Sequence, residues 1–265
     1  MEDNIKTPYE RVMLARDKDR PQINAYIEFL FDDFTELKGD GISGEDGAIL
    51  GGIALFHDIS VTVIGHKKGN STEENIACNF GMASPEGYRK AARLMKQAEK
   101  FGRPVITIID TPGAYPGLMA EANGQANAIA ENLALMSGLR VPIIAVITGE
   151  GSSGGALGIA VADRVFMLEN AVYSILSPEG FASILWKDSK RADEAAKLMK
   201  LTAAELLEYD IIDGIVKEGV KLAKNLDELL YKELTELRKQ KEGSLVKNRY
   251  RKFREIDKVK KAVKA

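Results

Sequence analysis

The chain has 265 residues, of which 45% are hydrophobic, so it is long enough and apolar enough to bury a sizeable core. Its formal net charge of −2 gives no overall attraction to nucleic acid, and its single cysteine, Cys78, excludes an internal disulfide and a cysteine zinc site. Residues 1–21 are too polar for a signal peptide, and no apolar run approaches the roughly 18 residues of a membrane span. We expect a soluble, cytoplasmic α/β protein with no metal site and no membrane or nucleic acid partner.

Apolar spacing and turn residues predict strands that alternate with helices along most of the chain. The turn His57-Asp58 joins two strand-like runs into a hairpin, and Ser84-Pro85-Glu86 is a typical helix start. In chain order the expected elements are a helix at 23–37, strands at 48–56 and 59–64, a polar surface loop at 67–83, a helix at 84–102, a strand at 104–110, a turn at 111–117, a helix at 120–136, strands at 143–147, 165–168 and 171–176, a helix from 178 to 186 with more helix through 207, a strand at 211–216 and a helix at 222–241. This alternation favours stacked β-α units around a mainly parallel sheet.

Charged and basic segments outside these elements carry weaker expectations. The pairs Lys67-Lys68 and Arg89-Lys90 are expected to be solvated surface charge. The basic stretch 241–265 is expected to be solvated or to face a partner, with Tyr250 and Phe253 spaced for docking.

The stretch 143–162 is the most informative part of the sequence. A buried strand at 143–147 is followed by a turn with four glycines and then by an apolar segment, 156–162, that reads as a buried helix. A helix whose first turn carries only Ser and Gly leaves main-chain N–H groups open to a ligand. The pattern indicates an anion site made of backbone.

Two familiar motifs fit this turn in part. Residues 149–154 match the dinucleotide fingerprint G-x-G-x-x-G, with Glu169 further on, which leaves an NAD-binding oxidoreductase subunit as an alternative function. The fingerprint normally opens its fold, however, whereas this match lies in the middle of the chain. Residues 151–155 also match the serine nucleophile elbow, but the only histidines, His57 and His66, lie upstream and are expected at the surface or in satisfied contacts.

A third interpretation uses both glycine turns together. Gly113 and Ala114 follow the strand 104–110 as Gly154 and Gly155 follow the strand 143–147. If these strands are parallel neighbours, both turns lie at one edge of the sheet, and their N–H groups can converge on a single oxygen. The sequence therefore predicts a backbone oxyanion hole, suited to chemistry through an enolate or a similar anion.

Seven strings of the sequence, in chain order, are AILGGIA (48–54), IGHKKG (64–69), NFGMASPEGYRKA (79–91), IDTPGAYPG (109–117), GEGSSGGAL (149–157), VYSILSPEGFASILWKD (172–188) and VKNRYR (246–251). Together they resemble one known family, the alpha subunit of the carboxyltransferase of multi-subunit bacterial acetyl-CoA carboxylase. The resemblance covers nearly the whole chain from about Tyr9, and the strings at 109–117 and 172–188 are the most specific.

The resemblance implies a crotonase-like (ClpP/crotonase) fold, a spiral of β-β-α units with C-terminal helices. It implies transfer of a carboxyl group from carboxybiotin, held on a biotin carboxyl carrier protein, to acetyl-CoA, which gives malonyl-CoA for fatty acid biosynthesis. It also implies activity only with a beta subunit, in an α2β2 assembly, with biotin carboxylase in the wider complex. A non-catalytic scaffold of the same fold is a further alternative.

The same resemblance sets expectations for the site and for the layout of the chain. Gly154-Gly155, helped by Gly113-Ala114, would hold the ureido oxygen of biotin, and the metal ligands of the family belong to the beta subunit. The expected substrate contacts are Tyr115, Pro116, Gly117 and Ser153. We expect an N-terminal helical segment at 1–45, the carboxyltransferase core at 46–220 and a basic helical tail at 221–265, all within one domain.

Overall fold

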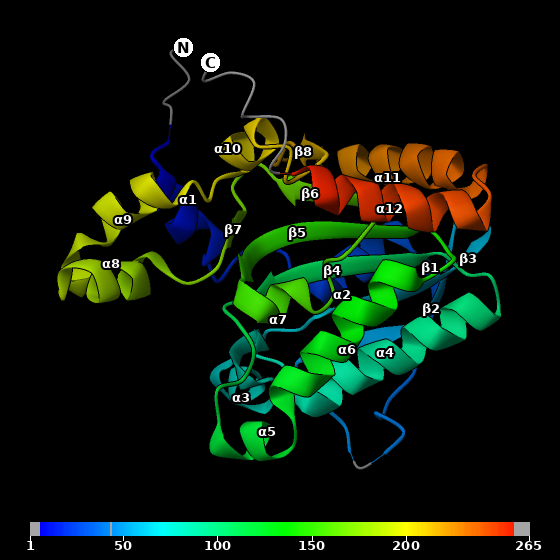
Figure 1. Ribbon diagram of the computed structural model, residues 1–265, viewed down its shortest axis with the longest axis horizontal. Coiled ribbons are helices and arrows are strands. Elements are labelled where there is room, and N and C mark those ends of the chain that lie inside the picture. Colours follow the sequence, from blue (N-terminus) through cyan, green and yellow to red (C-terminus); the bar gives the residue numbers. More distant parts are fainter. Residues whose placement is uncertain (1–5, 43, 257–265) are drawn as a thin grey trace.

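The computed structural model describes residues 6–42 and 44–256, and within these ranges it is built on an eight-stranded sheet (Figure 1). The main path of the sheet has the order β1-β2-β3-β4-β5-β6-β8, and β7 pairs with the end of β5. The strands are β1 (Asp32–Glu36), β2 (Ile49–Phe56), β3 (Ile59–His66), β4 (Val105–Thr111), β5 (Ile143–Ser152), β6 (Arg164–Leu168), β7 (Val172–Ser174) and β8 (Gly214–Val216).

The sheet is antiparallel from β1 to β3 and parallel from β3 onward, which confirms the predicted α/β class with a mainly parallel sheet. Every residue of β4 and β5 is buried, as the continuous apolar runs in their sequences indicate for strands covered on both faces. The predicted hairpin is also confirmed. His57 and Asp58 both have positive φ, 47° and 61°, which is the turn geometry that matches the twist of paired strands.

The helix expected at 23–37 is wrong in its second half. Helix α2 (Ile23–Leu30) ends at Leu30, and the next residues form the edge strand β1 against β2. A Cβ atom at Gly52 would overlap the backbone oxygen of Thr35 and crowd the Phe34 ring, so glycine in β2 lets this strand approach closely. The pairing is a tertiary interaction that helical spacing alone does not reveal.

Helices cover both faces of the sheet. A Cβ atom at Gly51 would meet Leu94 of α4 (Pro85–Lys100), whereas one at Gly65 would meet Ile23 of α2, so α4 and α2 lie on opposite faces. Figure 1 shows α4 beside α6 (Gln125–Gly138). The remaining helices are α1 (Pro8–Ala15), α3 (Thr72–Ala77), η1 (Asn79–Gly81), α5 (Leu118–Ala122), α7 (Ser153–Leu157), α8 (Pro178–Trp186), η2 (Ser189–Arg191), α9 (Ala192–Met199), α10 (Ala203–Glu208), α11 (Leu222–Arg238) and α12 (Glu242–Glu255).

Three other expected elements differ in detail. The polar stretch 67–83 is not wholly irregular, because Ser71 caps the short helix α3 through the N–H of Glu74. The helix expected from 178 to 186 is confirmed as α8, and the further helix expected through 207 is divided into α9 and α10 at Lys200, which has a left-handed φ. The apolar segment 156–162 is buried as expected, but its helix α7 ends at Leu157 and continues as turns.

The C-terminal helix α12 is fixed to the core by a buried arginine. Arg249 is 1% exposed and donates to both carboxylate oxygens of Asp163, at 2.9 and 2.8 Å. It also donates to the carbonyl oxygens of Met136, Leu139 and Val141, at 2.6, 2.8 and 3.2 Å. The expectation of a solvated or partner-facing tail is therefore wrong for Arg249, which is part of this chain's own core, whereas Lys247, Arg251 and Arg254 of the same helix are exposed as expected.

The rest of the expected tail divides into parts. Phe253 packs against the hydrophobic core, while Tyr250 is exposed, so the two aromatic residues do not form one docking face. Residues 257–265 lie outside the described residues. Within the described residues no helix combines the length and the apolar character that crossing a membrane requires.

Candidate functional site

The fold brings the two predicted turns into direct contact. Strands β4 and β5 are parallel neighbours, so the turns that follow them leave the same edge of the sheet. A Cβ atom added at Gly155 would overlap the main-chain N of Ala114 and the carbonyl C of Gly113. Position 155 therefore accepts only glycine, and its backbone lies within van der Waals reach of the first turn.

The first turn offers one main-chain donor rather than two. The N–H of Gly113 donates to the hydroxyl of Thr111 at 3.0 Å, and that hydroxyl donates back to the Gly113 carbonyl at 2.7 Å. Gly113 has φ of 147°, a conformation that favours glycine. The N–H of Ala114 has no hydrogen-bond partner in residues 6–42 and 44–256, and it is the donor of this turn that faces Gly155.

In the part of the chain that the structure describes, the N–H groups of Gly154 and Gly155 at the start of α7 have no hydrogen-bond partner. Ser152 makes no side-chain cap, and Ser153 enters the helix with a left-handed φ of 57°. The carbonyl of Gly154 accepts from the N–H of Gly158 at 2.9 Å, so the N–H of Gly155 in the same peptide unit points the opposite way, out of the helix start. The main-chain nitrogen of Ala114 thus lies against Gly155, whose own N–H is directed out of the start of the helix.

An apolar cavity of about 620 Å³ opens beside this point. Ser153 and Gly154 form part of its wall, so the structure brings the second turn and this cavity together. Its other lining residues were not predicted from the sequence: they are Leu157, Tyr173, Ser174, Ile175, Phe181, Met199, Lys200, Leu206, Tyr209 and Ile211.

The loop of Tyr115, Pro116 and Gly117 lies outside the lining of that cavity. The Tyr115 ring folds back over Gly117, where a Cβ atom would overlap it. The loop is tied down because the N–H of Tyr115 donates to the Ala83 carbonyl at 3.0 Å, and Gln125 donates to the carbonyls of both residues. These three residues therefore adjoin the first turn but do not share a wall with Ser153.

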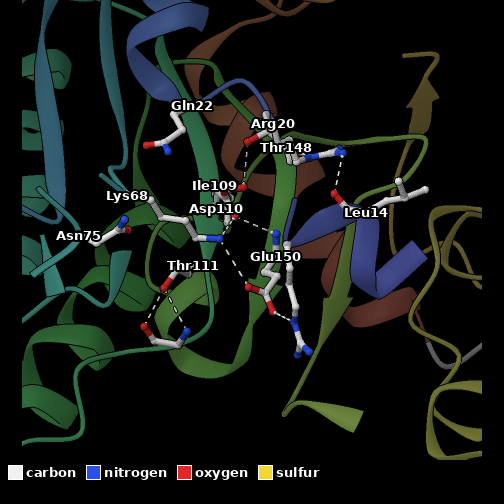
Figure 2. Close-up of polar contacts among 12 residues, drawn as sticks. Leu14, Arg20, Gln22, Lys68, Asn75, Ile109, Asp110, Thr111, Thr148 and Glu150 are labelled. Carbon is white, nitrogen blue, oxygen red and sulfur yellow. Dashed lines mark hydrogen bonds and ion pairs between the residues drawn. The ribbon is translucent and has the colours of Figure 1, made fainter. Parts of the chain in front are cut away.

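An ion network supports the ends of the strands beneath the turns (Figure 2). Lys68 lies 2.6 Å from a carboxylate oxygen of Asp110 and 3.5 Å from one of Glu150. The N–H of Glu150 donates to the same Asp110 oxygen at 2.9 Å, and Arg16 of α1 pairs with Glu150 at 2.8 Å. The network joins the loop after β3 to β4, β5 and the N-terminal region, and it holds the strand ends from which the two turns leave.

The expectation of solvated charge at Lys68, Arg89 and Lys90 is wrong. Lys90 is 0% exposed, donates to the Ile49 carbonyl at 2.8 Å and pairs with Glu45. Arg89 bridges Asp40 and Glu86, at 2.9 and 2.8 Å. These positive charges are structural because buried charges are retained where they are paired.

The two histidines have opposite environments. His57 at the hairpin tip is exposed, and its Nε2 lies 2.8 Å from a carboxylate oxygen of Asp227. This confirms the expectation that it makes a surface contact. His66 contradicts that expectation, because it is 1% exposed and neither ring nitrogen has a partner within the described part of the chain. Neither histidine hydrogen-bonds Ser153 in these residues, so the arrangement of a serine hydrolase is absent there.

The dinucleotide alternative is not supported by the local structure. The helix that follows the G-x-G-x-x-G match, α7, is five residues long. A Cβ atom at Gly149 would overlap the Asp110 carboxylate, so this glycine serves packing against a negatively charged side chain. In the described residues no cluster of three or more His, Cys, Asp or Glu side chains is arranged to hold a metal ion.

Comparisons with solved structures agree with this geometry at the level of the fold. The core of transcarboxylase 12S superimposes with a TM-score of 0.72 at 18% identity, covering 86% of this chain and 45% of the solved one. The beta subunit of geranyl-CoA carboxylase from P. aeruginosa gives a TM-score of 0.68 at 17% identity, covering 88% and 45%. The matched region therefore spans less than half of either solved chain. Both neighbours have the crotonase-like fold, and the expectation of that fold is confirmed.

Comparisons by sequence cover nearly the whole chain. An acetyl-coenzyme A carboxylase carboxyl transferase subunit alpha from Clostridium beijerinckii is 57% identical over 258 residues, 94% of this chain and 95% of that protein. The Bacillus subtilis protein of the same name is 55% identical over 264 residues, 97% and 81%. A model of the family described as acetyl co-enzyme A carboxylase carboxyltransferase-like matches residues 3–257. The chain belongs to this acetyl co-enzyme A carboxylase carboxyltransferase-like family.

Proposed function

We propose that this chain is the alpha half of an acetyl-CoA carboxyltransferase. Together with a beta subunit, in an α2β2 assembly, it transfers the carboxyl group from carboxybiotin on a biotin carboxyl carrier protein to acetyl-CoA, and the product is malonyl-CoA. Biotin carboxylase is the further partner in the complete complex. Relatives at 54–57% identity that carry the name of this subunit support the proposal.

The observation that carries the proposal is the contact between the two glycine turns. Acyl and carboxyl transfer develop negative charge on oxygen, and backbone N–H groups fixed in advance stabilise that charge without reorganising. The donors of Ala114, Gly154 and Gly155 are the groups we assign to this task. Gly113 acts through its conformation, because its own N–H is bonded to Thr111.

The residues present fit a biotin ring. A pocket of about 620 Å³ lies within the range of small-molecule sites, and its largely apolar lining suits a fused-ring ligand whose polar edge meets backbone donors. When bound, carboxybiotin supplies the carboxyl group that is transferred. Ser153 is proposed to contact this ligand from the cavity side, and Tyr115, Pro116 and Gly117 from the side of the first turn. The chain's task is to bind, to orient, to exclude water and to donate hydrogen bonds.

The test is the reverse reaction, in which malonyl-CoA carboxylates biotin, measured with the chain alone and with its beta subunit. We expect activity only in the mixture. Gly155→Ala forces the two turns apart and should lower kcat by about 10²–10³-fold, as the loss of an oxyanion donor does. Gly138→Ala is the matched control, because Gly138 is exposed on α6 and nothing lies within 4 Å of an added Cβ atom.

Each variant is first shown to assemble with the beta subunit by size-exclusion chromatography. An assembled Gly155→Ala enzyme with the wild-type rate would remove this turn from the mechanism. An assembled wild-type mixture without activity would contradict the carboxyltransferase assignment itself.

A further inference from the structure

The hydroxyl of Thr111 makes two hydrogen bonds to the first glycine turn (Figure 2). Thr111 is the last residue of β4, is 0% exposed and pairs in register with Gly151 of β5. Its oxygen accepts the N–H of Gly113 at 3.0 Å, and its proton is donated to the Gly113 carbonyl at 2.7 Å. The sheet therefore fixes this side chain, and the side chain holds the peptide units on both sides of Gly113.

The backbone freedom of this turn is concentrated at Gly113. The ring of Pro112 locks the φ angle of that residue. Gly113 has φ of 147°, and no atom lies within 4 Å of a Cβ atom added to it, so glycine is needed here for its conformation rather than for space. Because glycine restricts its own backbone less than any other residue, the peptide unit that follows it has more than one accessible orientation.

The orientation of the Gly113–Ala114 peptide unit decides what the turn presents to an anion. The N–H and the carbonyl of a trans peptide point in opposite directions, and the described residues contain no cis peptide. A Gly113 carbonyl held by the Thr111 hydroxyl therefore directs the N–H of Ala114 away from Thr111. The nitrogen of that N–H lies beside Gly155, and the reverse orientation would present a carbonyl oxygen, which repels an anion.

The hydroxyl is well placed to select between these orientations. Within residues 6–42 and 44–256 no main-chain N–H donates to the Gly113 carbonyl, and the N–H of Ala114 has no partner. The hydrogen bond from Thr111 therefore favours the orientation in which Ala114 acts as a donor.

We propose that Thr111 is a positioning residue, whose hydroxyl holds the Gly113–Ala114 peptide unit so that the N–H of Ala114 is directed at the substrate oxygen. This rests on the proposed function, because it assigns a role within the same oxyanion hole. The hydroxyl has a single proton, which is donated to the Gly113 carbonyl, so Thr111 neither donates to the substrate nor transfers a proton.

The decisive variant is Thr111→Val, which keeps the β-branched shape of the side chain and removes the hydroxyl. We expect kcat of the assembled enzyme to fall about tenfold, less than for loss of a direct donor. KM for malonyl-CoA should stay within about twofold of the wild type, because the affected hydrogen bond acts on charge that develops in the transition state. The melting temperature should fall, since two buried groups of Gly113 lose their partner, so rates are compared per assembled complex well below the melting temperature of each variant.

Thr111→Ser keeps the hydroxyl and loses the methyl group. We expect its kcat to stay within about threefold of the wild type, because serine is less restricted than threonine at χ1. This variant decides the question even if Thr111→Val does not assemble. A fall of tenfold or more in Thr111→Ser would assign the role to the methyl group and overturn the proposal.

Another threonine of the same strand supplies the matched control. Thr107 is 0% exposed in β4, and its hydroxyl has no hydrogen-bond partner within the described part of the chain. Thr107→Val should therefore leave kcat unchanged and should not lower the melting temperature. If Thr111→Val retains the wild-type kcat, or if Thr107→Val loses as much rate, the positioning role is wrong.

A second readout does not depend on activity. The sequence contains three Gly–Ala peptides, at 47–48, 113–114 and 155–156, so the full chain labelled with ¹³C-carbonyl glycine and ¹⁵N-alanine gives three coupled signals. Ala48→Ser and Gly155→Ala each remove one signal, which assigns all three.

We expect Thr111→Val to move the 113–114 signal, because that carbonyl loses a hydrogen bond, and to leave the 47–48 signal in place. Thr111→Ser should keep the wild-type position of both signals. A 113–114 signal that does not move in Thr111→Val overturns the proposal. If the wild-type mixture lacks activity while the expected changes are seen, the carboxyltransferase assignment fails and the positioning of this peptide unit stands.

Discussion

Arg249 provides a sharp test of how the C-terminal helix is held. In Arg249→Met the side chain keeps much of its apolar length and loses the guanidinium. That group makes five hydrogen bonds, to Asp163 and to three carbonyls at the end of α6 and in its connection to β5. The Asp163 carboxylate, 4% exposed, is then left with the N–H of Ile143 as its remaining partner from the main chain. Breaking a buried pair in this way typically costs about 3–5 kcal/mol.

The free energy of unfolding of Arg249→Met should therefore fall by about 3–5 kcal/mol in urea titrations, since an uncompensated carboxylate remains buried. For a chain of this size that corresponds to a fall in the melting temperature of about 6–20 °C. Arg251→Met is the control, because Arg251 is exposed on the same helix, and its effect should stay within about 0.5 kcal/mol. Equal effects of the two substitutions would refute the argument that burial and pairing, rather than helix composition, hold α12.

Three further predictions follow from local geometry. Ser153 has a φ of 57°, a left-handed conformation that a β-branched residue adopts only with backbone strain. Ser153→Val should therefore lower the free energy of unfolding by about 1–2 kcal/mol, while Ser153→Gly should be near neutral. Equal costs of the two substitutions in urea titrations would contradict this strain. Gly65→Ala should lower the free energy of unfolding by about 1–3 kcal/mol, because the new Cβ atom would overlap the Ile108 carbonyl oxygen. A loss of stability as small as that of Gly138→Ala would contradict this overlap. Burial raises the pKa of the Glu218 carboxyl, but hydrogen bonds from Arg20 and Asn170 outweigh burial, so the pKa in the folded protein is lowered. The carboxylate therefore stabilises the folded protein above about pH 4.5, and this stabilisation is lost as the pH falls through the lowered pKa of the folded state. The stability difference between Glu218→Gln and the wild type should shrink from pH 7 to about pH 3, and a difference that does not change with pH would contradict the pairing.

Local sequence patterns were sufficient to predict those parts of the structure that are determined by residues close together in the chain. The hairpin was predicted because His57 and Asp58 interrupt two apolar runs, and turn chemistry acts over a few residues. The contact between the two glycine turns was also foreseen, since apolar runs of the length and composition of β4 and β5 are typical of adjacent buried strands. For the same reason Gly155 could be placed beside Gly113 and Ala114, whereas the oxyanion hole that we assign to these turns stays a prediction.

Features that depend on distant partners could not be predicted in this way. Lys90 pairs with Glu45 and Lys68 with Asp110, across separations of 45 and 42 residues, and nothing near either lysine distinguishes it from solvated charge. The edge strand β1 was missed because its pairing with β2 is decided by Gly52, far from its own sequence. The lining of the cavity was missed because it is drawn from β7, α8, α9 and α10, which contribute one or two residues each without a common spacing.

The position of Arg249 in the chain also bears on how the protein is made. Its carboxylate partner Asp163 precedes it by 86 residues, which at about 5–20 residues per second is roughly 4–17 s of synthesis. During that interval β5 and the glycine turn have already been translated, but Arg249 has not. The carbonyls of Met136, Leu139 and Val141 therefore lack the hydrogen bonds that the guanidinium donates to them in the folded chain. The proposed oxyanion turn is therefore translated before the arginine that completes the hydrogen bonding of Asp163 and of these carbonyls, so the two features are finished at different stages of synthesis.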